Sequence, residues 1–205
     1  MIKVLTPANA VAITLDLLKE HLRIIGTDED ATLQLYLSAA TEVFEAFANI
    51  CLVNQTITQI FDQFPCEDYF LLERGAPLGS ITHIKYYDED NVLQTMPADD
   101  YIVCDKAVPP KICLATNANW PTDIHPTRFS AVEVTYTAGY GASEASVPKD
   151  IKLALASLVG DMYQNKEDSI TMPGSVKIDV NWPSVRFIKK YKPHYYEHPS
   201  QGRPL

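Results

Sequence analysis

The stretch AVEVTYTAGYG, residues 131–141, alternates apolar and polar side chains and ends in Gly139-Tyr140-Gly141. Alternation with a period of two is typical of a β-strand, and glycine can take the positive φ that a tight corner requires. Val147-Pro148 then leads into DIKLALASLVGDMY, which has helical spacing with a proline near its first turn. The stretch therefore predicts a strand, a corner and a helix.

Two functional motifs resemble this corner, and both fail on their surroundings. A potassium-channel filter needs flanking membrane helices of roughly 18 or more apolar residues, and no window of this chain is that long and uncharged. A dinucleotide-binding loop needs a third glycine three residues after the second, where Glu144 stands. We therefore interpret TAGYG as a structural corner.

The composition predicts a soluble globular protein. The chain has 205 residues, of which 46% are hydrophobic and 21% are charged, so it can bury one good core or two small ones. Its first residues, MIKVLTPANAVAITL, lack the charged leader, long apolar core and cleavage site of a secretory signal. We expect synthesis and retention in the cytoplasm.

Cysteine spacing argues against a zinc ribbon or a thioredoxin-like site, because no CxxC pair is present. We expect reduced, partly buried thiols. The four cysteines are Cys51, Cys66, Cys104 and Cys113.

Charge divides the chain into an acidic body and a basic tail. Residues 170–205 hold six Lys or Arg and two acidic residues, net +4, whereas the rest holds 11 basic and 24 acidic residues, net −13. This division favours a protein partner for the tail, or association of the tail with the body, over a merely solvated tail. Direct DNA binding by the body is disfavoured, because it lacks a cluster of basic residues.

The N-terminal part predicts two amphipathic helices that pack as an antiparallel pair. Thr14 is expected to cap the first, TLDLLKEHLRI, which ends near Gly26. Thr27 with the acids 28–30 is expected to cap the second rather than bind a metal, because carboxylates stabilise a helix N-terminus. The apolar faces expected are Leu15, Leu18, Leu22 and Ile25 on the first helix, and Leu33, Leu37, Ala40, Phe44 and Phe47 on the second.

From about residue 54 the hydrophobic period changes to two, which predicts an antiparallel sandwich or barrel. The acidic run 88–91 between two of these strands is interpreted as a hairpin turn, because the glycine and distal glutamate of a calcium loop are missing. The expected strands are QTITQIFDQF, DYFLLER, ITHIKYYD, VLQTM, YIVCD, KICLA and AVEVTYT.

The helix after Pro148 is expected to end around Asn165 and to return to the N-terminal helices. Its expected apolar face is Ile151, Leu155, Leu158, Val159 and Met162. The fold class is therefore α+β, with a small helical layer built from both ends of the chain and an inserted antiparallel β-sandwich or barrel. The expected parts are residues 1–53 and 147–168 for the helical core, 54–141 for the β module, and 169–205 for an extended basic, aromatic tail.

No catalytic, metal or cofactor site is predicted. The chain contains no GxxxxGK[ST], HExxH or GxSxG motif. His194 and His198 have helical spacing, but Pro193 and Pro199 leave no room for a regular helix between them. The paired turn acids, residues 88–90 and 99–100, have no neighbouring base or nucleophile in the sequence and are interpreted as solvated.

The order of these pieces resembles the tailed-phage head–tail connector family, also called adaptor or head-completion proteins. The likeness runs from about residue 14 to residue 168. Its most specific pieces are TLDLLKEHLRI, GAPLGSITHIKY, and VTYTAGYG before the proline-initiated helix that ends in DMYQNKE. Beyond it, only VRFIKKYK, residues 185–192, resembles the family, and HYYEHPSQGRPL matches no family pattern.

The resemblance implies a structural, non-enzymatic role in the virion. Such proteins form a ring, commonly dodecameric, beneath the portal of a DNA-filled capsid, and the ring extends the DNA channel. The implied partners are the portal protein, a neck or tail-completion protein, further copies of this chain, and passing DNA bound without sequence specificity, with no membrane. The implied location is the head–tail interface, after assembly in the host cytoplasm.

The resemblance also implies that the C-terminal segment binds the portal. Carried onto this sequence, apolar contacts come from Val185, Phe187, Ile188 and Tyr191, and electrostatic contacts from Lys189, Lys190 and Lys192.

Two other functions stay open on the sequence. One is a neck or tail-completion protein that binds only the tail side. The other is a hydrolase or carbohydrate-binding β module, in which aromatic residues stack on sugars, although core packing is their commoner use. The aromatic candidates are Tyr86, Tyr87, Trp120 and Tyr140.

Overall fold

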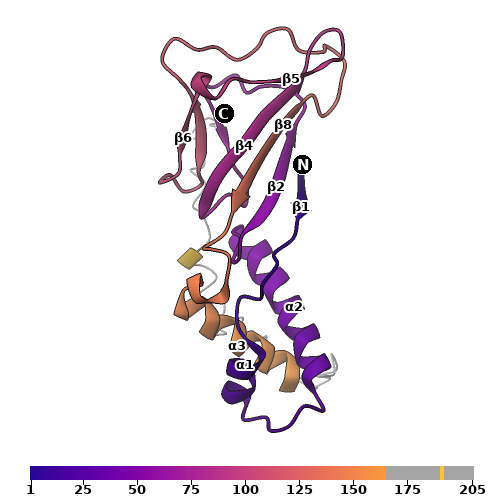
Figure 1. Cartoon of the computed structure of the whole chain (residues 1–205), viewed down its shortest axis with the longest axis vertical. Helices are drawn as coiled ribbons and strands as arrows, with labels where there is room; N and C mark the ends of the chain where they lie inside the picture. The colour runs from indigo at the N-terminus through magenta and orange to yellow at the C-terminus, as the bar shows by residue number, and fades with distance from the viewer. Residues whose placement is uncertain (165–189, 192–205) are drawn as a thin grey trace, which may run out of the picture.

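The computed structural model describes residues 1–164 and 190–191. It is elongated, with a helical layer at one end and a β module at the other (Figure 1). The fold is α+β, as the sequence predicted: residues 55–138 form β-strands, and the segments on either side form helices, preceded by one N-terminal strand.

In the described part of the chain, the β module consists of two antiparallel sheets (Figure 1). One has the strand order β1-β2-β8-β4-β5 and the other the order β3-β7-β6. All seven strands expected from the alternating pattern form. The strands are β1 (Ile2–Thr6), β2 (Gln55–Phe61), β3 (Tyr69–Leu71), β4 (Leu78–Tyr87), β5 (Leu93–Thr95), β6 (Tyr101–Cys104), β7 (Lys111–Leu114) and β8 (Val132–Ala138).

The sequence pattern does not predict strand β1, which lies in a segment expected to belong to the helical part. It pairs antiparallel with β2. At its start the Met1 amino group donates to the Ile60 carbonyl at 2.8 Å, and the Ile60 amide donates to the Met1 carbonyl at 2.7 Å. Four of its five residues are exposed, so it lacks the half-buried alternation that reveals the other strands.

Within residues 1–164 the helical layer contains three helices, α1 (Leu15–Leu22), α2 (Asp30–Ala48) and α3 (Lys149–Gln164). Two short 3-10 turns, Ala98–Asp100 and Glu144–Ser146, precede β6 and α3. The most extensive helix packing joins α2 to α3, and α1 contacts both. The main pair therefore combines the two ends of the chain, whereas we expected the two N-terminal helices to form it.

Helix α1 is shorter than predicted. Thr14 caps it as expected, accepting a hydrogen bond from the Leu17 amide at 3.3 Å. The helix stops at Leu22 rather than near Gly26, because Arg23 adopts a left-handed conformation with φ 58°. Ile25 then points into solvent, 99% exposed, so its assignment to the apolar face was wrong.

The acidic start of α2 also differs from the prediction. The N-cap residue is Glu29, and its side chain makes no capping hydrogen bond. Asp30 instead pairs with Lys19 of α1 at 2.7 Å, so this acid ties two helices together. Four of the five expected core residues of α2 are buried, but Phe47 is 65% exposed.

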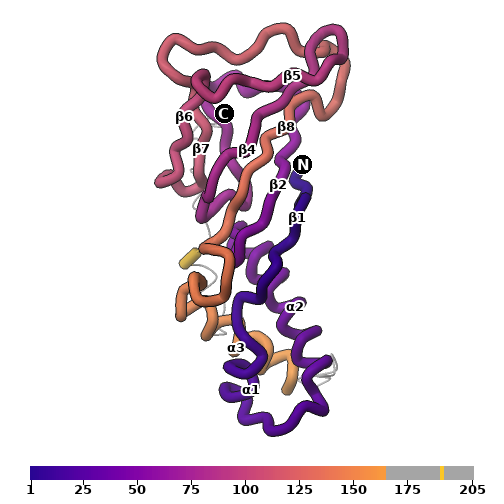
Figure 2. The backbone as a smooth tube through the Cα atoms, viewed as in Figure 1, coloured from indigo at the N-terminus to yellow at the C-terminus, as the bar shows by residue number. Residues whose placement is uncertain are grey.

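Two separate cores result, one within the helical layer and one between the sheets. The backbone tube in Figure 2 shows the chain passing between the two parts after β1, before β2 and after β8. The predicted hairpin turn after β4 also forms: the Asp88 carboxylate accepts hydrogen bonds from the Val92 amide at 2.8 Å and from Gln94 Nε2 at 2.7 Å.

Candidate functional site

The TAGYG corner lies where the β module returns the chain to the helical layer. The Gly139 amide donates to the Pro77 carbonyl at 2.9 Å, and the Asn54 amide donates to the Gly141 carbonyl at 3.0 Å. Gly139 has φ +141°, and a Cβ there would lie 2.5 Å from the Asn54 nitrogen. Only glycine permits this close approach, so the corner locks the end of β8 against the start of β2.

Asp150, in the first turn of α3 beside this corner, holds part of the C-terminal segment. Its carboxylate accepts hydrogen bonds from the Tyr191 hydroxyl at 2.7 Å and from Lys190 Nζ at 2.6 Å. The Ile151 amide also donates to it at 3.0 Å. Tyr191 packs against the helical core together with Tyr140 of the corner. We call Asp150, Tyr140, Lys190 and Tyr191 the C-terminal anchor.

The acidities of these groups follow from their contacts. Burial would raise the pKa of Asp150, but the hydrogen bonds from Lys190 and Tyr191 outweigh it and hold that pKa below its ordinary value. Burial, followed by the hydrogen bond to Asp150, raises the pKa of Tyr191 to about 12. Burial and the neighbouring Tyr191 raise the pKa of Tyr140 to about 12. At neutral pH the anchor therefore joins one anion, one cation and two neutral phenols.

The anchor includes two of the seven residues that the family resemblance implied for portal binding, Lys190 and Tyr191. Both contact the body of their own chain, and association of the tail with the body was one of the two alternatives that the division of charge favoured. The other five, Val185, Phe187, Ile188, Lys189 and Lys192, lie outside the described residues, as do His194 and His198.

A second polar cluster joins the helical layer to the β module. The Glu45 carboxylate, in a residue only 6% exposed, accepts hydrogen bonds from the Leu52 amide at 2.8 Å, from Gln55 Nε2 at 2.9 Å and from the Arg74 guanidinium at 2.9 Å. Cys51 lies beside it, and burial raises the pKa of this thiol to about 12. We call Glu45, Gln55 and Arg74 the buried joint.

The aromatic residues that could stack on sugars are engaged in packing. Trp120 stacks on Phe64, with ring centroids 5.3 Å apart, and its indole N–H donates to the Glu67 carbonyl at 2.9 Å. Tyr86 makes an edge contact with Phe64, and Arg128 covers the ring of Tyr87 at 3.5 Å. These contacts favour a structural use of the aromatic residues.

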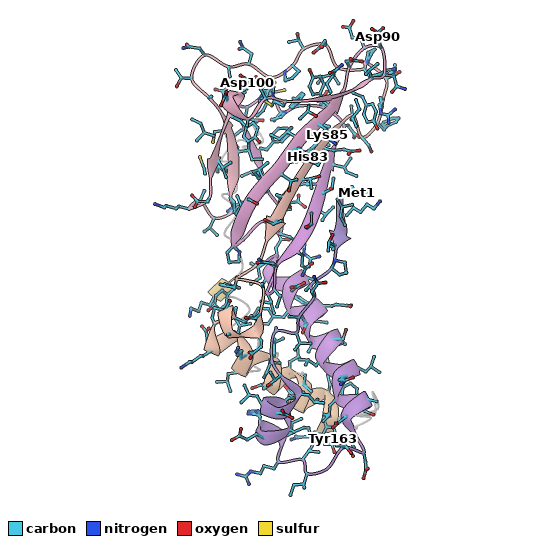
Figure 3. The ribbon with its side chains drawn as sticks, viewed as in Figure 1. Met1, His83, Lys85, Asp90, Asp100 and Tyr163 are labelled. Atoms are coloured by element: carbon cyan, nitrogen blue, oxygen red, sulfur yellow. The ribbon has the colours of Figure 1, made fainter. Side chains whose placement is uncertain are left out.

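The acidic turns and the helical layer lie at opposite ends of the molecule. Figure 3 labels Asp90 and Asp100 at the end of the β module remote from the helices, and Tyr163 at the opposite end of the molecule. In the described part of the chain, no three His, Cys, Asp or Glu side chains gather in a way that could hold a metal ion. Within the same residues, no helix is long and apolar enough to cross a membrane.

Comparison with known families agrees with this architecture. The model of a protein family described as head completion protein matches residues 12–176. The chain belongs to the head completion protein family. The match covers the three helices and strands β2 to β8, whereas β1 lies before it and the segment that includes Lys190 and Tyr191 lies after it. A search of curated proteins found no match to this chain.

Solved structures share the fold of this family member. One is a chain in the neck of an empty gene transfer agent (GTA) particle computed with C6 symmetry, with TM-score 0.78 and 23% identity over 100% of both chains. Another belongs to the neck of a native GTA particle computed with C12 symmetry, with TM-score 0.75 and 22% identity over 100% of both chains. A third is in the virion of a native GTA particle, with TM-score 0.76 and 22% identity over 95% and 96% of the two chains.

Sequence reasoning missed the partners of the anchor and the buried joint. Asp150 was visible as an acid in the first turn of a helix, which is a common stabilising position. Its contact with Tyr191 joins residues 41 positions apart, and no local pattern marks such a pair. The burial of Glu45 was not predicted, because its neighbours on the same face of the helix are polar residues that are typical of a solvent-exposed surface.

Proposed function

We propose that this chain is a structural, non-enzymatic virion protein that joins the capsid portal to the neck and tail. The observation that carries the proposal is the family match over residues 12–176. The shared fold with chains from GTA necks, over their full length, supports a place in the neck.

In the proposed assembly, copies of this chain form a ring that extends the DNA channel. The symmetries of the two GTA neck structures, C6 and C12, support a closed ring. The net −13 of residues 1–169 suits a channel wall, because phosphates are repelled from an acidic surface and DNA slides without adhering. DNA is then a passing partner rather than a bound ligand.

We propose further that the C-terminal segment docks to the portal. The basic residues of this segment would meet acidic groups, and Phe187 and Ile188 would supply apolar contacts. The anchor supports this role, because it attaches Lys190 and Tyr191 to the first turn of α3. The neighbouring residues of the segment are thereby held close to this part of the body.

A neck protein that binds only the tail side is the second candidate, and the same family match is compatible with it. Loss of the gene separates the two roles. If the chain joins the portal to the tail, electron microscopy of particles made without it should show filled heads that leak DNA or fail to accept tails. Intact, DNA-retaining heads with the neck ring already attached would move the chain to the tail side.

A further inference from the structure

Helix α2 carries two apolar faces rather than one. Its first face is buried in the helical core and includes Leu33, Leu37, Ala40 and Phe44. A second set recurs every four residues and lies at the surface. We call this set the apolar ridge: Leu35 (67% exposed), Ala39 (partly buried), Val43 (37% exposed) and Phe47 (65% exposed).

Such a ridge is unusual on a solvated helix. Side chains four residues apart form a continuous row that packs into the groove of a neighbouring helix. An apolar face of this kind ordinarily marks a contact surface, because an amphipathic surface helix turns polar residues to water. Within the described residues, nothing covers Leu35 or Phe47.

A matching apolar groove of about 580 Å³ lies between α1 and α3. Leu17 and Leu153 are 43% and 48% exposed in it. Its apolar lining includes Ile13, Leu17, Leu153 and Ala156, and its polar lining consists of Glu20, His21, Lys149 and Lys152.

The ridge and the groove face away from the core that the three helices share. At about 100° per residue, Leu153 lies roughly 200° around α3 from the buried Ile151, and Leu35 lies roughly 200° around α2 from the buried Leu33. Since α2 and α3 pack through their buried sides, one copy cannot place its ridge in its own groove. Two different surfaces that pair between copies make a head-to-tail contact, which can close into a ring.

Charge complements this fit. Helix α2 contains no Lys or Arg, and Glu42 is exposed beside the ridge. In the groove, Lys149 is exposed and Lys152 is paired with Glu144 at 2.9 Å. The exposed Glu42 beside the ridge attracts the exposed Lys149 of the groove, where Glu20 is the one acidic lining residue. Like charges on two ridges disfavour ridge-to-ridge pairing.

We propose that the apolar ridge of one copy packs into the α1–α3 groove of the next copy. The proposal rests on the proposed ring and identifies the surfaces that build it. The apolar side chains would lose their exposure to water in this contact, and the two unlike surfaces would leave each copy able to bind one neighbour on each side.

A mixing experiment tests this arrangement directly. Leu35→Glu breaks the ridge and keeps the groove, whereas Leu153→Glu breaks the groove and keeps the ridge. We expect full-length wild type, at concentrations up to about 1 mM, to form assemblies larger than a dimer, measured by sedimentation or native mass spectrometry. Each variant alone should be monomeric. An equal mixture should give a heterodimer of twice the 22.9 kDa chain mass and nothing larger, because only one intact ridge–groove pair remains.

Ile25→Glu provides the matched control, since Ile25 is a 99% exposed apolar residue of the helical part that belongs to neither surface. It should assemble like wild type, and circular dichroism should show all three variants folded.

Wild type that stays monomeric throughout the concentration range would overturn the proposal, as would covering of the ridge by residues of the same chain beyond Gln164. Assemblies unchanged by Leu35→Glu would overturn the assigned surfaces and leave the ring intact, while portal binding tests the proposed function separately.

Discussion

The buried joint and the C-terminal anchor use the same chemistry in different surroundings. In each, one carboxylate accepts hydrogen bonds from a backbone amide, from a basic side chain and from one further side chain. The Glu45 side chain is 7% exposed and its partner Arg74 is 23% exposed. The Asp150 side chain is 25% exposed and its partner Lys190 is 63% exposed.

This difference in burial predicts different roles. Removing one partner of a buried ion pair leaves an uncompensated charge and is strongly destabilising, whereas an exposed pair contributes little because water replaces it. The buried joint should therefore hold the helical layer and the β module together permanently. The anchor should hold the C-terminal segment in place and still be able to release it.

The largest effect should follow from breaking the buried joint. Glu45→Ala leaves Arg74, Gln55 and the Leu52 amide without their acceptor, and we expect a loss of about 3 kcal/mol in the free energy of unfolding. Urea unfolding followed by circular dichroism measures it. The control Glu42→Ala changes an exposed glutamate on the same helix and should stay within about 0.5 kcal/mol of wild type. Equal stability of the two variants would mean that the joint is not structural.

The TAGYG corner should give the next largest effect. Gly139→Ala forces a Cβ to within 2.5 Å of the Asn54 nitrogen in a residue with φ +141°, and we expect a loss of about 2 kcal/mol in unfolding free energy. Gly26→Ala is the comparison, because Gly26 also has positive φ (+93°) but a Cβ there would meet nothing within 4 Å. A larger loss at Gly26 than at Gly139 would contradict the close approach at the corner.

Breaking the anchor should cost far less stability. Asp150→Asn removes the charge that Lys190 and Tyr191 share, and we expect less than about 1 kcal/mol of change in unfolding free energy. Hydrogen exchange of the peptide that contains Lys190 and Tyr191 should nevertheless become faster. Asp16→Asn is the matched control, since Asp16 is likewise the second residue of its helix. Exchange that is unchanged in Asp150→Asn would show that the anchor does not hold this segment.

The smallest effect is the pH dependence of the anchor. The pKa of Asp150 lies below its ordinary value, so its contribution is complete above the ordinary aspartate range and is lost as the pH falls through the lowered pKa. The pKa of Tyr191 is raised to about 12, so its contribution is complete below about pH 10 and is lost as the pH rises through 12. Protection of Tyr191 should thus be constant from about pH 5 to pH 9, measured as exchange corrected for the intrinsic pH dependence. A step near neutral pH would contradict this assignment.

The fold was largely predictable because most of its strands and helices show a regular hydrophobic period in the sequence. The alternation in β2 and β8 and the three- and four-residue spacing in α2 and α3 are local signals. Strand β1 has no such signal, because it is exposed on an edge and depends on pairing with β2. Phe47 was misassigned because helical spacing shows only that an apolar face exists and does not say whether the same chain covers it.

The sites were less predictable than the fold. The partners of Asp150 and Glu45 come from residues 41 and 29 positions away, and such pairs depend on how the helical layer meets the β module. The division of charge had indicated a contact of the basic tail with a partner or with the body, without naming the residues. Family resemblance implied that the segment that includes Lys190 and Tyr191 binds the portal, and this role stays a prediction.

The central claim is that the C-terminal segment binds the portal while the body remains a folded unit. The most direct measurement is a pull-down by the portal protein encoded in the same genome, using the full-length chain and a chain truncated after Ser169, each shown to be folded by circular dichroism. We predict that the portal retains the full-length chain and loses the truncated one. Equal retention of both, or failure of the full-length chain to bind, would contradict the claim.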